Sequence, residues 1–141
     1  MEQRDYLLRQ IQLMTQAIVT LIRRLTGLKE DSSGSEEEIQ QATNEMLSEQ
    51  LGMELDDILN IPLVELTDKI VNKNGIHLDN LDLFAEVIFL NAEACIEKEK
   101  REQLLLMALE LFSYTDRVSA TFSIDRQAKI NTIKSLLDQN E

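Results

Sequence analysis

The residues of this sequence best suited to chemistry lie near its C-terminal end, in the stretch YTDRVSATFSIDRQAKI at positions 114–130. Basic groups stand on either side of a run of hydroxyl groups there, and both kinds of group donate hydrogen bonds to carboxylate and phosphate oxygens. The stretch therefore predicts an anion or ligand corner, with Asp116 as a further polar group. The candidate residues of this corner are Arg117, Ser119, Thr121, Ser123 and Arg126.

The same stretch also reads as the joint of a helical hairpin. Ser123 is a good N-cap for a last helix, and Asp125 falls in the first turn of that helix, where negative charge is favourable. Phe122 would then fill the corner between the two helices. In this interpretation the two arginines of the corner pair with Asp116 and Asp125 instead of holding a ligand.

Motifs for catalysis or metal binding are missing from the rest of the sequence. His77 and Cys95 are the single histidine and cysteine, which are too few ligands for a zinc site and make any Ser-His-Asp triad depend on His77. His77 is expected at the surface or in a helix cap, and Cys95 as an inert core residue. We expect no cofactor and no metal, and the lack of a catalytic motif favours a binding protein over an enzyme.

The charge of the chain is strongly negative and unevenly placed. The formal net charge is −12, and residues 36–103 alone carry seventeen acidic and five basic side chains. Nucleic-acid binding needs a basic face, so this distribution argues against it. The acidic middle is either a solvated surface or a surface for a basic partner.

A long N-terminal helix over residues 1–28 carries a regular apolar pattern. Its apolar residues alternate at spacings of four and three, which is the period of a heptad repeat. We call this row the heptad seam and expect it to pack either on other helices of the chain or on a second copy in a homodimer. The candidate self-association residues are Leu7, Ile11, Met14, Ile18, Leu21 and Leu25.

The remaining sequence predicts further helices joined by short connections. Residues 29–35 read as a flexible linker after a stop at Gly27. Ser35 with Glu38 matches a capping box that opens a helical body over 36–141, and Gly52 is expected to close the first helix of this body. Later helices are expected over residues 62–74 and, after an N-cap at Asp79, up to residue 96. A charged break is expected at 97–102, followed by a helix from residue 104 and a last helix from Ser123. The helix after Asp79 is apolar on nearly all sides and should be central.

These patterns together predict one all-α domain over 1–141, with about six helices arranged as stacked antiparallel hairpins in a repeat-like or bundle manner. The low content of glycine (4) and proline (1) suits long helices rather than sandwiches or barrels. We find no leader peptide and no apolar run of membrane-spanning length, and a single cysteine fits a reducing compartment, so a cytoplasmic location is expected.

Two resemblances accompany this interpretation. Ala108 and Phe112 reproduce the A-x3-F part of the tetratricopeptide pattern, so residues 79–138 resemble a degenerate hairpin of that repeat. RDYLLRQI at 4–11 and TFSIDRQAKI at 121–130 resemble the ends of a family of small, uncharacterised bacterial proteins. That resemblance implies a helical, repeat-like protein without an assigned activity or catalytic residues.

The function predicted from the sequence is a protein–protein interaction or scaffold module that acts through helix faces. Its partner would be another protein or a second copy of the chain. The alternative is a small-molecule binder or enzyme with a cleft between helices near the corner at 114–126.

Overall fold

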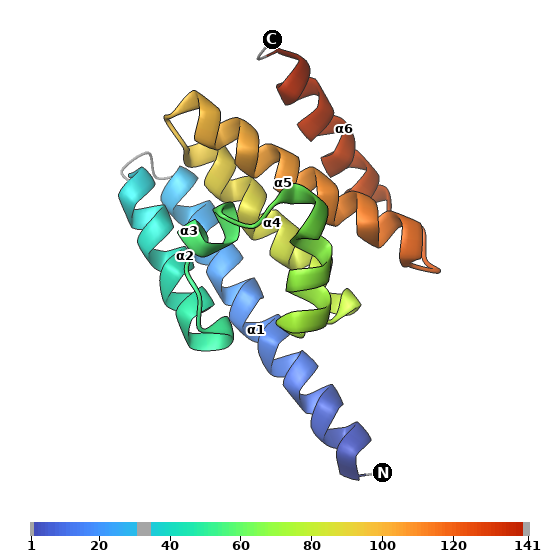
Figure 1. Cartoon of the computed structure of the whole chain (residues 1–141). Coiled ribbons are helices and arrows are strands. Elements are labelled where there is room, and N and C mark those ends of the chain that lie inside the picture. Colours follow the sequence, from blue (N-terminus) through green and yellow to red (C-terminus); the bar gives the residue numbers. More distant parts are fainter. Residues whose placement is uncertain (1, 31–34, 140–141) are drawn as a thin grey trace.

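A computed structural model describes residues 2–30 and 35–139 of the chain, and the described residues are helical without β-strands (Figure 1). This confirms the all-α prediction and the long N-terminal helix. In chain order the elements are α1 (Glu2–Glu30), α2 (Glu36–Leu51), α3 (Leu55–Leu59), a 3-10 turn η1 (Leu63–Glu65), a π-helical segment η2 (Asp68–Lys73), α4 (Leu78–Ala94), α5 (Lys98–Val118) and α6 (Ile124–Gln139).

Consecutive long helices pack as antiparallel pairs, α1 with α2, α4 with α5, and α5 with α6 (Figure 1). The α1–α2 pair packs on the α4–α5 pair through α1 and α4, which run parallel to each other. Residues Ile11 and Thr15 of α1 bond to Asn80 at the start of α4, while Lys29 reaches Glu93 near the end of α4. The stacked hairpins predicted from the sequence are therefore the observed arrangement.

Helix α4 is the centre of the core, as its apolar pattern predicts. Ten of its residues are buried, and Phe84, Leu81 and Ile88 are fully enclosed. Packing against α1, α2 and α5 covers most of this helix, which explains why its sequence lacks a simple amphipathic period. Cys95 at the end of this helix is buried, as expected.

Several helix ends match the sequence-based predictions. The Ser35 hydroxyl accepts a hydrogen bond from the Glu38 amide at 3.1 Å and starts α2, and the Ser123 hydroxyl accepts one from the Arg126 amide at 3.1 Å at the start of α6. Helix α2 ends at Gly52, whose φ of 66° lies in the left-handed region that favours glycine.

Other ends differ from those predictions. Gly27 does not stop α1, which continues to Glu30, so Lys29 and Glu30 belong to the helix and not to the predicted linker. Residues 31–34 of the predicted linker lie outside the described residues. The charged run at 97–102 is the first turn of α5, because charged side chains are good helix formers and Arg101 bonds back to the Glu97 carbonyl.

Two more corrections concern the segment before α4. His77 caps α4 in place of Asp79, since its Nδ1 accepts a hydrogen bond from the Asp79 amide at 3.1 Å. The predicted helix over 62–74 is divided into η1 and η2. Both the amide and the side chain of Asn74 bond to the Lys69 carbonyl, and these bonds hold the wider π-helical turn.

Candidate functional site

The α5–α6 corner, residues 114–126, is organised around the guanidinium of Arg126. This side chain is only 5% exposed. Its Nε donates to Asp116 Oδ1 at 3.2 Å, its Nη1 donates to Asp82 Oδ2 at 3.0 Å, and its Nη2 donates to the Thr121 carbonyl at 2.8 Å. Each guanidinium nitrogen thus already donates to the protein itself.

The charges around Arg126 are those of a structural ion-pair cluster. Burial lowers the pKa of the Arg126 guanidinium, but the hydrogen bonds and negative charges of Asp82 and Asp116 outweigh this, and the pKa is raised overall. The guanidinium therefore stays charged, with two carboxylates around it. An anion entering this place would meet a surplus of negative charge.

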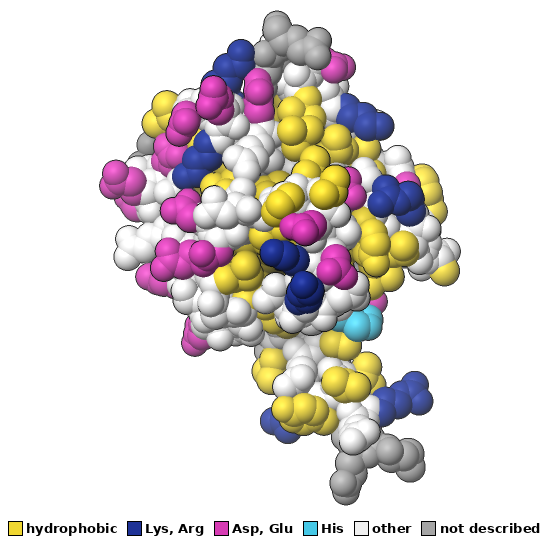
Figure 2. Space-filling model, viewed as in Figure 1, with side chains coloured by type: hydrophobic (Ala, Val, Ile, Leu, Met, Phe, Trp, Pro, Cys, Tyr) yellow, Lys and Arg dark blue, Asp and Glu magenta, His cyan; other side chains and the backbone are white. Residues whose placement is uncertain are grey.

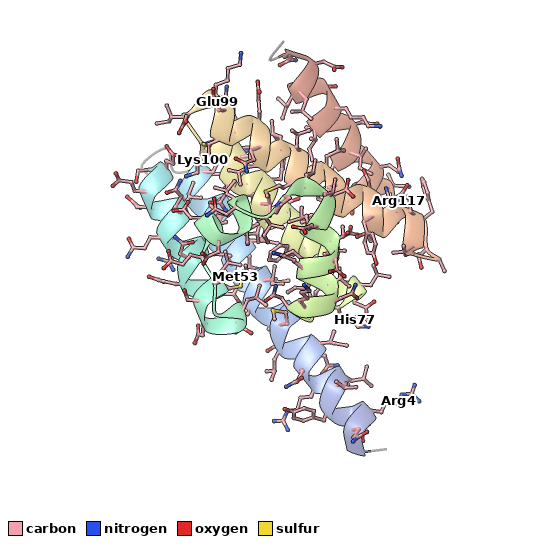
Figure 3. All side chains as sticks on the ribbon, in the orientation of Figure 1. Arg4, Met53, His77, Glu99, Lys100 and Arg117 are labelled. Carbon is pink, nitrogen blue, oxygen red and sulfur yellow. The ribbon has the colours of Figure 1, made fainter. Side chains whose placement is uncertain are left out.

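The other predicted corner residues hold the joint between the helices. Ser123 caps α6, and the Ser119 hydroxyl accepts a hydrogen bond from the Thr121 amide at 3.1 Å. Arg117 lies apart from this cluster on the outer side of α5 (Figure 3), with its Nη2 3.7 Å from a carboxylate oxygen of Glu110. The structure thus brings together four of the five predicted residues, without Arg117, as a hairpin joint.

Two expectations about this corner are wrong in detail. Phe122 does not fill it, because the ring is 73% exposed and Arg126 occupies the space between the helices. The second carboxylate of the cluster is Asp82 of α4, not Asp125, which is exposed. The signal for Asp82 was a charge within the mostly apolar central helix, because a partly buried charge needs a partner.

The heptad seam is divided between a buried and an exposed half. Ile18, Leu21 and Leu25 are buried against the other helices, while Leu7 is 57% exposed. Ile11 and Met14 are half-buried between these two halves. Most of the seam within the body therefore packs inside the chain, and its N-terminal end does not.

Helix α1 extends beyond the other helices at its N-terminal end (Figure 1). We call residues 3–13 the projecting segment. Hydrophobic side chains gather on this part of the molecule (Figure 2). Those with large exposed fractions are Tyr6 (62%), Leu7 (57%), Leu8 (49%) and Leu13 (54%). The sequence-based prediction contained Leu7 of this group and missed the other three, because they stand beside the heptad positions.

The projecting segment also carries a net positive charge. Arg4 and Arg9 are exposed on it against the single acid Asp5, and Figure 3 shows Arg4 far from the corner that carries Arg117. The remainder of the chain is acidic, and acidic side chains gather over α2 (Figure 2).

A shallow groove of about 390 Å³ runs between α1 and α2. Leu21, Ala42 and Met46 provide its apolar part, and Glu45 and Glu49 lie along its α2 side. Leu13 lines the groove as well as belonging to the projecting segment, so the two features are continuous. The residues that line the groove are Leu13, Gln16, Ala17, Thr20, Leu21, Arg24, Ala42, Glu45, Met46, Glu49 and Gln50.

A smaller cavity of about 130 Å³ lies among α1, α2 and α4. Lys29 and Glu93 form an ion pair at 2.8 Å beside it, and Glu36 lines it as well. Burial raises the pKa of the nearby Cys95 thiol, and the negative charge of Glu36 raises it further, so both effects disfavour the reactive thiolate. The volume of this cavity is well below the several hundred Å³ of an ordinary ligand pocket.

The described residues contain no metal-binding cluster and no membrane-spanning helix. Within the described residues, histidine, cysteine, aspartate and glutamate form no group of three or more that could hold a metal ion. None of the helices described is both long enough and apolar enough to cross a membrane. No family model, curated protein or solved structure matches the chain. The resemblance to small bacterial helical proteins therefore stays a prediction.

Proposed function

We propose that this chain is a protein-interaction module whose binding surface is the projecting segment of α1. The observation that carries this proposal is the exposure of four large apolar side chains on about 16 Å of one helix. Scattered single apolar residues are normal on protein surfaces, but four of them exposed within residues 6–13 of one helix end are typical of an interaction site.

The physical chemistry of the segment favours a bound partner. Burying one leucine-sized side chain contributes about 1.5–3 kcal/mol, and tyrosine is among the residues that most often anchor interfaces. A helical segment of this length without tertiary contacts is marginally stable by itself. A partner that covers the apolar side chains would stabilise the helix at the same time, in the manner of a helix bound in a groove.

The small-molecule alternative has less support. At the predicted corner each guanidinium nitrogen of Arg126 already donates to Asp82, Asp116 or the Thr121 carbonyl. The cavity beside Lys29, at about 130 Å³, is smaller than an ordinary ligand pocket.

Site-specific photocrosslinking tests the proposal. A photoreactive phenylalanine analogue in place of Tyr6, which is exposed, should give a protein adduct in a lysate of the source cells. The matched control carries the same analogue at Thr132, which is exposed on α6. Adducts at position 6 and none at position 132 are expected. If position 6 gives no protein adduct, or both positions give the same adducts, the projecting segment is not an interaction surface.

A further inference from the structure

We infer that the partner of the projecting segment is the α1–α2 groove of a second copy of this chain. The two copies form a two-fold dimer in which each segment lies in the groove of the other copy. This inference rests on the proposed function, since it names the partner of the same surface. Three features of the described residues carry it: charge, continuity and interface area.

The charges of the segment and the groove are complementary. The segment presents Arg9 beside the face that carries Tyr6 and Leu13, whereas the groove is bordered by Glu45 and Glu49 of α2. Glu45 already pairs with Arg24 of its own chain at 3.4 Å. Glu49 is exposed and forms no ion pair with a described residue, so it is available to an arginine from outside. Such complementarity fixes orientation and register in an interface.

The helical period places the docking face of the segment in line with the groove. Tyr6, Leu13, Ala17 and Thr20 follow one another at spacings of seven, four and three, so they lie on one side of α1. The last three line the groove, and Tyr6 extends the same face outward. A two-fold axis beside Leu13 therefore places each projecting segment antiparallel to the other α1, with Tyr6 in the apolar part of the groove.

The area needed for a stable complex favours docking in the groove over pairing of the two segments alone. A specific interface buries about 800 Å² on each partner. Two helices that touch over about 16 Å fall well short of this area. In the two-fold arrangement each copy contributes both a segment and a groove, so the contact between segment and groove is formed twice.

A charge swap between Arg9 and Glu49 tests this geometry by sedimentation velocity at micromolar concentrations. We expect the native chain to dimerise, and R9E and E49R each to weaken the dimer about tenfold or more, because both contacts in each homodimer then oppose like charges. An equimolar mixture of R9E and E49R should regain the dimer. In that heterodimer one contact carries the swapped pair and the other carries the native pair.

Both side chains are exposed, so the single variants should keep the helical circular dichroism and melting temperature of the monomer. A native chain that stays monomeric up to high micromolar concentration overturns the inference, whereas the photocrosslinking result at position 6 separately decides the proposed function. A native dimer that E49R does not weaken also overturns it, because the groove is then not the docking site. If the mixture of R9E and E49R fails to restore the dimer, the arrangement in which each segment lies in the groove of the other copy is excluded.

Discussion

Replacing Arg126 by methionine tests the role of the α5–α6 corner. Methionine keeps most of the length and the apolar stem of the side chain, so packing between the helices is largely retained. The change removes the guanidinium that bonds to Asp82, Asp116 and the Thr121 carbonyl. It therefore isolates the ion-pair cluster from the shape of the core.

The expected cost follows from the burial of the groups that lose their partner. Removing one partner of a buried ion pair costs about 3–5 kcal/mol because the remaining charge is left uncompensated. The side chains of Asp82 and Asp116 are each 34% exposed, so water solvates them in part and the low end of this range applies. We expect R126M to lower the free energy of unfolding by about 3 kcal/mol, which corresponds to about 10 °C in Tm for a chain of this size.

Urea unfolding followed by circular dichroism measures this cost, with two comparisons. R117M changes an exposed arginine on the same corner and should alter the stability by less than about 1 kcal/mol. Adding D82N to R126M should restore part of the lost free energy of unfolding, since the amide removes a carboxylate charge that has no partner. The coupling energy between the two substitutions should be about 1–2 kcal/mol. If R126M and R117M cost the same, the buried guanidinium does not hold the corner together.

Three other predictions concern the described core and helix ends. Ser123→Ala should cost about 0.5–2 kcal/mol in urea unfolding, because the helix cap is lost; a change within error would show that the cap is not stabilising. In the heptad seam, Leu25→Ala should cost about 2–5 kcal/mol and Leu7→Ala less than about 0.5 kcal/mol, because the first side chain is buried and the second exposed. Equal costs by thermal unfolding would contradict the division of the seam. Labelling of Cys95 by a disulfide reagent should be slow in the native chain and immediate in urea, and since the pKa of the thiol is raised, the native rate should still increase with pH above 9.0. Rapid native labelling at neutral pH would contradict burial of the thiol.

The helices and most of their caps could be predicted because local rules determine them. The hydroxyls of Ser35 and Ser123 and the glycine at position 52 act within one turn of their own helix, so the sequence alone carries the signal. The apolar content of α4 likewise predicts a central helix without knowledge of its neighbours.

The candidate site could be predicted only in part, because it depends on contacts far apart in the sequence. Asp82 and Arg126 stand 44 positions apart, and no local pattern joins them. The heptad seam has the same period along its whole length, yet Ile18, Leu21 and Leu25 are buried while Leu7 is exposed. Whether an apolar residue is covered depends on where α2 and α4 end relative to α1, which is a property of the packed helices.

Amide hydrogen exchange of the native chain at low and high micromolar concentration tests the central claim most directly. In the monomer the projecting segment should exchange rapidly, because few tertiary contacts hold it. On dimerisation we expect protection to increase in residues 3–13 and in the groove-lining part of α2 around residues 42–50, with no change in α6. Exchange that does not depend on concentration, or protection that appears on α6 instead, would contradict the docking of the projecting segment into the groove of a second copy.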